Sequence, residues 1–281
     1  MENLGYYNGK FGLIEEMTIP MNDRVCFFGD GVYEATCSKN HKIYMLDAHI
    51  NRFYSSAEQL KMVIPHTKEE LKALLCDLVL KVDDGEQFVY WQITRGTAPR
   101  NHAFNKLEVP ANLWVMLRPA KIKDTHRKIK LITLPDTRFL HCNIKTLNLI
   151  PAVMAATAAE EAGCYEAVLH RDGRVTECAH SNVHIIKDGV FRTAPTDNLI
   201  LPGIARANLI RFCKELGVPV CEEPFTLDEM MAADEVIVSS SSAFCLAAEM
   251  IDGTPVGGKA PEILNSLRDA CIIDFDKATA I

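Results

Sequence analysis

One lysine near the middle of the chain has the surroundings of a nucleophile. Lys145 lies among apolar neighbours in the stretch Ile144-Lys145-Thr146-Leu147-Asn148-Leu149. A lysine drawn into an apolar site has a lowered pKa, and its neutral amine can form a Schiff base with a carbonyl group. The same stretch also suits a lysine whose stem lies on apolar neighbours while its ammonium group reaches water. The residues alone leave both interpretations open.

An acid on a predicted strand is a second candidate. Glu177 follows the turn expected at Asp172-Gly173, within Val175-Thr176-Glu177. A carboxylate beside an apolar site can hold the proton of a pyridine-type ring nitrogen in place. A solvent-exposed carboxylate on a strand would give the same pattern, so the residue alone does not decide.

Two segments could bind an anion together. Gly203 precedes a predicted helix that opens with Ile204 and Ala205, and free amides at a helix N-terminus attract negative charge. Ser240 and Ser241 follow a predicted strand and could add hydroxyl donors. A glycine before a helix is also ordinary turn chemistry, so each signal is weak by itself.

A loop rich in basic residues could bind a carboxylate. Residues 94–102 end a predicted strand and include Arg100 and His102. Arginine can bind a carboxylate through two parallel hydrogen bonds, and histidine can add a charged donor. Tyr33 lies on another predicted strand, just after two glycines that allow close backbone approach. A solvated loop and a core tyrosine are the alternatives.

Turn signals and apolar periodicity place these residues on a mixture of strands and helices. We expect helices over residues 47–62 with Asp47 as N-cap, from the Thr67–Glu70 capping box onward, over 149–162 and 204–216, and from Pro261 onward. We expect strands over residues 87–94, 112–117, 128–134 and 234–239, and hairpin turns at Asn8-Gly9, Lys39-Asn40, Asp172-Gly173, Asp188-Gly189 and Asp252-Gly253. Hairpins mixed with helices predict an α+β fold with largely antiparallel sheets. A polar stretch with a proline indicates two domains, residues 1–118 and 126–281, joined by a linker over residues 119–125.

Composition disfavours several classes of protein. The chain has 281 residues, of which 48% are hydrophobic and 24% charged, as is typical of a globular protein. Its net charge of −7 disfavours nucleic acid as a partner, and no stretch approaches the roughly 18 apolar residues of a membrane helix. No signal peptide is visible, so a cytoplasmic location is expected. The ten cysteines and nine histidines are dispersed without the spacing of a zinc site, so no metal is expected.

Taken together, these segments resemble the class IV (fold type IV) pyridoxal-phosphate aminotransferases, and among them the bacterial D-amino-acid aminotransferases. The resemblance covers nearly the whole chain. It runs through Phe28–Glu34, His49–Arg52, Thr94–Thr97, Ile144–Leu149, Gly163–Ala167, Val175–Glu177, Ser181–Val183 and Lys187–Gly189. It implies a two-domain α+β enzyme whose antiparallel sheets are flanked by helices and whose cofactor, pyridoxal 5'-phosphate (PLP), binds at the domain interface.

The resemblance also implies a role for each candidate residue. Lys145 matches the lysine that binds PLP covalently and later moves the α-proton of the substrate. Glu177 matches the acid that pairs with the pyridine nitrogen. The phosphate positions are matched by Arg52, Ile204, Ala205 and Ser241, with Ser240 as a neighbouring cofactor contact. The substrate carboxylate trap is matched by Tyr33, Arg100 and His102, the last two supplied by the neighbouring subunit of a homodimer.

The implied reaction moves the amino group of a D-amino acid such as D-alanine to a 2-oxo acid such as 2-oxoglutarate, giving pyruvate and D-glutamate. The Arg100-x-His102 pair favours this activity over that of the branched-chain L-aminotransferases of the same fold. A 4-amino-4-deoxychorismate lyase, which releases pyruvate without an amino acceptor, is a second alternative. A PLP-binding protein without catalysis is a third, because Ala205 and His180 depart from the family pattern in the cofactor region.

Overall fold

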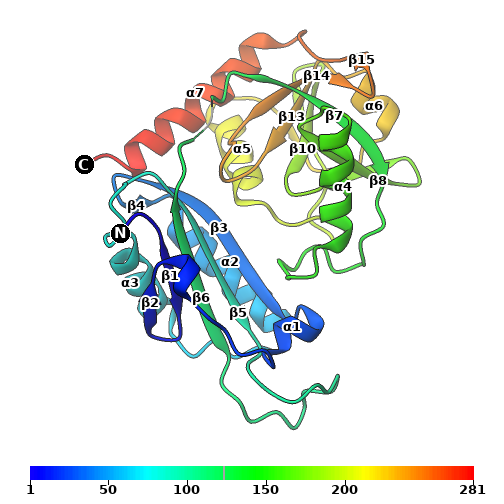
Figure 1. Ribbon diagram of the computed structural model, residues 1–281. Coiled ribbons are helices and arrows are strands. Elements are labelled where there is room, and N and C mark those ends of the chain that lie inside the picture. The colour runs from blue at the N-terminus through cyan, green and yellow to red at the C-terminus, as the bar shows by residue number, and fades with distance from the viewer. Residues whose placement is uncertain (123) are drawn as a thin grey trace. The chain divides into compact units, whose positions relative to one another are not determined.

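The computed structural model describes residues 1–122 and 124–281 (Figure 1). Internal contacts divide the chain into two compact units. The first unit comprises Met1–Ile122, Ile144–Asn148 and Asp276–Ile281, and the second comprises Leu149–Phe275 and the described part of Lys123–Asn143. Residue 123, inside the linker expected over residues 119–125, lies outside the described residues. The domain limits at residues 118 and 126 stay a prediction.

A six-stranded antiparallel sheet forms the core of the first unit, in the order β2-β1-β6-β5-β3-β4. Its strands are β1 (Leu4–Tyr7), β2 (Lys10–Gly12), β3 (Gly31–Lys39), β4 (Lys42–Ile43), β5 (Gln87–Thr94) and β6 (Asn112–Pro119). The hairpin turn predicted at Asn8-Gly9 is confirmed, with φ angles of 45° and 91°. The second turn lies at Asn40-His41, one residue later than expected, because these two residues take the left-handed conformation.

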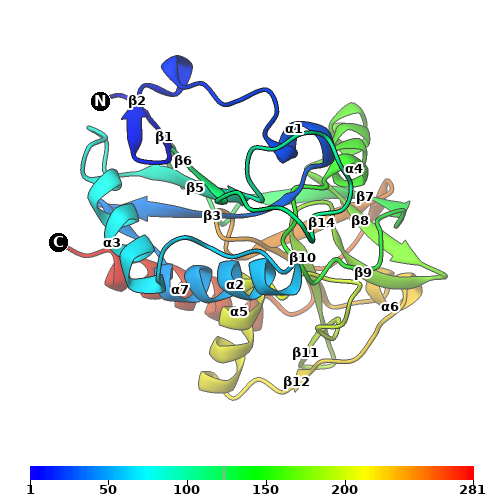
Figure 2. The ribbon, with the colours of Figure 1, turned by 90° about the horizontal axis from the view of Figure 1, so that it is seen from below.

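Helices α2 (Leu46–Gln59) and α3 (Lys68–Val79) lie on the same side of this sheet (Figure 2). The Thr67–Glu70 capping box of α3 is confirmed, since the Glu70 carboxylate accepts from the Thr67 amide over 2.7 Å. The prediction that Asp47 caps α2 is wrong. The N-cap is Met45, in the left-handed conformation with φ 52°, and Asp47 lies in the first turn, where it pairs with Lys72. Two short helices, η1 (Ile14–Glu16) and α1 (Arg24–Phe28), complete the unit.

A nine-stranded, mostly antiparallel sheet forms the core of the second unit. Its order is β12-β11-β10-β13-β14-β7-β8-β9, with β15 paired to β14. Its strands are β7 (Lys128–Pro135), β8 (Glu166–Arg171), β9 (Arg174–Cys178), β10 (Asn182–Lys187), β11 (Val190–Thr193), β12 (Val220–Cys221), β13 (Glu235–Ser239), β14 (Leu246–Ile251) and β15 (Thr254–Pro255). Only β11–β12, β14–β7 and β7–β8 among these described pairs are parallel. The predicted α+β class with largely antiparallel sheets is confirmed.

The helices of the second unit are α4 (Ile150–Glu161), α5 (Ile204–Glu215), α6 (Leu227–Met231) and α7 (Pro261–Ala278), whose end from Asp276 onward belongs to the first unit. Helix α4 packs against β7 and β8 through its alanines, and Gly163 follows its C-terminus with φ 68°, as expected. Sequence analysis missed α6, although its first turn carries a capping box of Thr226 and Glu229. Among the described residues, no helix is both long and apolar enough to cross a membrane.

Candidate active site

The segment Ile144–Asn148 of the first unit runs beside the start of β3 and places Lys145 next to Tyr33. The Tyr33 amide donates to the Lys145 carbonyl over 3.0 Å, and the Leu147 amide donates to the Gly31 carbonyl over 3.1 Å. The Lys145 Nζ lies 4.2 Å from the centroid of the Tyr33 ring. Both side chains are partly exposed. The structure thus brings together the candidate nucleophile and one residue of the expected carboxylate trap.

This close approach depends on a glycine. A Cβ atom at Gly31 would lie 2.4 Å from the Ile93 carbonyl oxygen and 2.6 Å from Leu147 Cδ1. The Ile93 backbone of β5 leaves no room for a methyl group, and Leu147 of the lysine-bearing segment would have to move its side chain, so this close packing around residue 31 needs a glycine. The close backbone approach predicted from the glycines before Tyr33 is confirmed at this position.

A buried ion pair fixes the expected phosphate ligand Arg52. Its Nε donates to Glu34 Oε1 over 2.7 Å and its Nη2 donates to Oε2 over 2.8 Å. His49 Nδ1 lies 2.6 Å from the same Oε2. Burial alone would raise the pKa of Glu34, but the pairing with Arg52 and His49 outweighs it and lowers the pKa to about 2. Burial, with the neighbouring cations Arg52 and Lys145, lowers the pKa of His49 despite its bond to Glu34.

Arg100 and His102 lie on an exposed loop of the first unit. The Arg100 guanidinium carbon is 5.3 Å from the centroid of the Phe28 ring, and the His102 ring is 4.9 Å from the same ring. Arg24 anchors the loop, because its Nη1 donates to the Asn101 carbonyl over 2.5 Å. Within the described part of the chain, no hydrogen bond or ring contact joins either loop residue to Tyr33.

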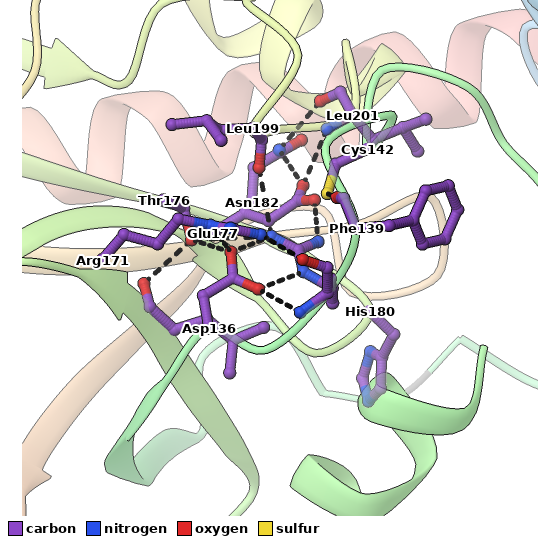
Figure 3. A network of polar contacts seen from close by, with 12 residues as sticks. Asp136, Phe139, Cys142, Arg171, Thr176, Glu177, His180, Asn182, Leu199 and Leu201 are labelled. Atoms are coloured by element: carbon purple, nitrogen blue, oxygen red, sulfur yellow. Dashed lines mark hydrogen bonds and ion pairs between the residues drawn. The ribbon is translucent and has the colours of Figure 1, made fainter. Parts of the chain in front are cut away.

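Glu177 in the second unit lies on β9 with its carboxylate buried among donors (Figure 3). Its Oε2 accepts from Asn182 Nδ2 over 3.0 Å and from the Leu201 amide over 3.1 Å. Its Oε1 accepts from Arg138 Nη1. The structure therefore places the candidate acid in an enclosed polar site rather than on a solvent-exposed face of a strand.

Arg138 links this acid to a second buried carboxylate, that of Asp136, and Figure 3 shows both acids. Its Nε donates to Asp136 Oδ1 over 3.0 Å and its Nη2 donates to Oδ2 over 2.8 Å. Burial would raise the pKa of Asp136, but the bonds from Arg138 outweigh it and lower the pKa. Burial alone would lower the pKa of Arg138, but its acidic partners outweigh burial and raise the pKa. Both groups are charged at neutral pH.

The expected phosphate residues of the second unit lie at the start of α5 and in the turn after β13. Ile204 and Ala205 are the first residues of α5, so their amides lie at the positive end of the helix. Gly203 precedes them, and a Cβ there would lie 1.9 Å from Asn182 Oδ1. In the turn after β13, the Ser240 carbonyl accepts from the Phe244 amide over 2.8 Å, so the serines sit on a closed turn.

Sequence analysis missed several residues that hold the candidates in place. Asp136 and Arg138 are two charged residues directly after β7, and this local concentration of charge was a usable signal. Glu34 was another, since it is an acid in the middle of an apolar strand. His49 stands three residues before Arg52 on the same helix, a spacing that places both on one face.

Comparison with known proteins identifies the family. The amino-transferase class IV family model matches residues 31–251. The chain belongs to the class IV aminotransferases. The aminotransferase is 42% identical to a D-alanine aminotransferase of Listeria monocytogenes serotype 4b (strain F2365), over 94% of this chain and 93% of the relative. It is 38% identical to a D-alanine aminotransferase of Bacillus licheniformis, over 91% and 90% of the two chains.

A solved structure shares both the fold and part of the sequence with this aminotransferase. The T.th. branched-chain amino acid aminotransferase with pyridoxamine 5'-phosphate superposes with a TM-score of 0.85 at 26% identity, over 98% of this chain and 94% of that chain. The resemblance stated from the sequence is confirmed, and the protein is a PLP-dependent aminotransferase of fold type IV.

The side chains of the two units fit this cofactor chemically. PLP carries an aldehyde, a phosphate and a pyridine nitrogen. The first unit supplies a primary amine at Lys145 and a guanidinium at Arg52, which suit the aldehyde and the phosphate. The second unit supplies a buried carboxylate at Glu177 and helix amides at Ile204, which suit the ring nitrogen and the phosphate.

Proposed function

We propose that this aminotransferase moves the amino group of a D-amino acid, with D-alanine as the first candidate, to a 2-oxo acid such as 2-oxoglutarate. The products are pyruvate and D-glutamate. The observation that carries this proposal is the 42% identity, over 94% of the chain, to a relative named D-alanine aminotransferase. The substrates are small molecules, as for aminotransferases in general.

Lys145 is the residue that we propose for both cofactor attachment and proton transfer. When bound, PLP supplies an electron-withdrawing ring that stabilises negative charge on the substrate α-carbon. The Lys145 amine would take the proton from that carbon and deliver it to the carbon that carried the cofactor aldehyde, and it would move the proton in the opposite direction when the 2-oxo acid is aminated. The Tyr33 ring, 4.2 Å from Nζ, limits the positions that the amine can take.

The remaining proposed roles follow the charge of each group. Glu177 pairs with the protonated ring nitrogen through a carboxylate that the protein already holds in one orientation. The phosphate is bound by donors from a guanidinium, helix amides and hydroxyls, namely those of Arg52, Ile204, Ala205, Ser240 and Ser241. The substrate carboxylate is bound by Tyr33, Arg100 and His102.

A homodimer is part of the proposal. Helix α4 turns its alanines toward the sheet and exposes Ile150, Val153 and Met154, which are 74%, 54% and 65% accessible. Contiguous exposed apolar side chains on a globular protein commonly mark an interface. We place the partner subunit on this face and propose that Arg100 and His102 act in the site of the partner. None of the ten cysteines, all among the described residues, is in a disulfide, which is typical of a reducing compartment, and we propose the cytoplasm.

The test is the visible absorption band of PLP bound to the purified protein. Addition of D-alanine should convert this band, whereas L-alanine should leave it unchanged. With 2-oxoglutarate present, pyruvate should accumulate and Lys145→Ala should produce none. Conversion by L-leucine but not by D-alanine would instead assign the activity of the branched-chain structural neighbour and overturn the proposed handedness.

A further inference from the structure

Glu177 is the last of four charged side chains that alternate in sign, and Figure 3 shows it together with Asp136 and Arg171. Arg171 Nε lies 3.3 Å from Asp136 Oδ2, and Arg138 Nη2 lies 2.8 Å from the same oxygen. Arg138 Nη1 then reaches Glu177 Oε1. The order is therefore cation, anion, cation, anion, with Glu177 as the terminal anion, and a further group that binds Glu177 would continue the alternation if it carried a positive charge.

Arg138 is held in place by every nitrogen of its guanidinium. Nε and Nη2 bind the two oxygens of Asp136, Nη1 binds Glu177, and Nη2 also donates to the Leu199 carbonyl over 3.1 Å. The carboxylate of Asp136 is fully buried and lies 3.0 Å from the Thr176 hydroxyl. A planar guanidinium bound at all its nitrogens cannot turn without breaking several bonds at once.

The position of Arg138 has an electrostatic consequence for Glu177. A cation at hydrogen-bond distance favours the ionised form of a carboxylate and makes it a weaker base. A weaker base leaves a shared proton on its partner. When the partner is a pyridine nitrogen, the ring then keeps its positive charge, which is the state that withdraws electrons most strongly.

We propose that Arg138, fixed by Asp136 and Arg171, is a positioning residue that keeps Glu177 ionised and in one orientation, so that the PLP ring nitrogen stays protonated. This inference rests on the proposed pairing of Glu177 with that nitrogen. Arg138 acts through Glu177 and has no direct part in the transfer of the amino group.

The test uses PLP with an isotopic label on its ring nitrogen, bound to the protein and followed by nitrogen NMR. The main variant is Asp136→Asn with Arg138→Gln, which removes the cation without leaving Asp136 as a buried charge that lacks Arg138. Arg192→Gln is the control, because Arg192 forms an ion pair with Glu229 over 2.9 Å in the same unit and does not contact Glu177. Circular dichroism and a melting curve establish that each variant is folded.

In the unaltered protein and in Arg192→Gln, the label should report a protonated ring at neutral pH. In the double variant the signal should move toward that of a neutral ring, because Glu177 gains proton affinity by a factor of about 10 to 1,000. A folded double variant that releases PLP while the control retains it would also support the inference, since Glu177 is then no longer held in the orientation that pairs with the ring nitrogen.

A double variant that binds PLP with an unchanged ring-nitrogen signal would overturn the inference and leave Arg138 with a structural role only. A neutral ring in the unaltered protein would overturn it as well. If the unaltered protein takes up no PLP, the proposed function fails and the inference fails with it. That outcome is distinguishable, because it appears before any substitution is made.

Discussion

Arg52 and Glu34 form a two-point ion pair inside the first unit, with Nε to Oε1 at 2.7 Å and Nη2 to Oε2 at 2.8 Å. The Glu34 side chain is fully buried, so little water competes for these bonds. The pair fixes the plane of the guanidinium, and a guanidinium that is already fixed loses less entropy when it binds an anion. The buried Glu34 carboxylate thereby orients Arg52, the proposed phosphate ligand, before an anion binds.

Replacement of Glu34 by glutamine should weaken the binding of PLP more than that of pyridoxal, which lacks the phosphate. The amide cannot form the charged two-point pair, so we expect the PLP dissociation constant to rise about tenfold, as for the loss of one charge-assisted hydrogen bond. Titration of the apoprotein with each compound measures both constants. Glu58→Gln, an exposed position on α2, the helix that carries Arg52, is the control. Equal losses for PLP and pyridoxal would show that Glu34 does not act through the phosphate.

His184 should make the second unit sensitive to acid. Its ring lies between the Thr193 hydroxyl at 2.8 Å and the Ser239 hydroxyl at 2.7 Å, and burial together with Arg206 lowers its pKa to about 3. The unfolded chain takes up a proton on this histidine below about pH 6.5 and the folded chain does not. Stability is therefore lost as the pH falls from 6.5 toward 3, by up to about 5 kcal/mol.

His184→Gln should flatten the dependence of the unfolding free energy on pH within this window, since glutamine does not titrate. Denaturant unfolding at a series of pH values provides the measurement. The exposed His126→Gln should leave the slope as it is in the unaltered protein. The same slope in both variants would mean that other groups cause the acid sensitivity.

The sequence predicts those parts of the structure that depend on local chemistry. The turns at Asn8-Gly9 and Asp172-Gly173 form where residues that tolerate positive φ stand between apolar strands. The capping box at Thr67 marks the start of α3 for the same local reason. Lys145 and Tyr33 are far apart in the chain, and the family resemblance rather than any spacing predicted that they belong to one active site.

The rest depends on contacts between distant residues. Arg138 and Glu177 are 39 positions apart, and nothing near either of them identifies the other. Met45 begins α2 without a capping side chain, because the turn after β4 forces the left-handed conformation there. Asp47, the stronger local signal, consequently lies in the first turn of the helix rather than at its N-cap. Contacts between residues that are far apart in the chain depend on how the strands pack into a sheet, and a single sequence does not reveal that packing.

Gly31→Ala should destabilise the protein and displace the lysine-bearing segment. The added methyl group would lie 2.4 Å from the Ile93 carbonyl oxygen, which is backbone and cannot move aside as a side chain could. We expect a loss of about 2–3 kcal/mol in unfolding free energy, together with loss of PLP. Gly12→Ala is the control, because its nearest neighbour is the flexible Glu16 carboxylate at 3.3 Å. Similar stability of the two variants would argue against a tight approach at Gly31.

Met154→Asp should separate the proposed dimer into monomers. The side chain is 65% exposed on α4, and a carboxylate at the centre of an apolar interface would be buried without a partner. Analytical ultracentrifugation measures the molar mass directly. Ile273→Asp on α7 is a matched control, since Ile273 is equally exposed at 65%. If both variants keep the same molar mass as the unaltered protein, the partner does not bind on α4.

Mixed subunits should show whether Arg100 acts in the site of the partner. Lys145→Ala removes the proposed nucleophile, and Arg100→Ala removes a residue of the proposed carboxylate trap, so each variant alone should have little activity. If Arg100 crosses the interface, a mixed dimer contains one site that has lost both residues and one that retains both. Subunits that exchange at random from an equal mixture should then recover about a quarter of the unaltered activity, because half of the dimers are mixed and each has one intact site. If Arg100 serves its own subunit, every site in every dimer lacks one of the two residues. In that case activity should stay at the level of the separate variants, because exchange of subunits creates no intact site.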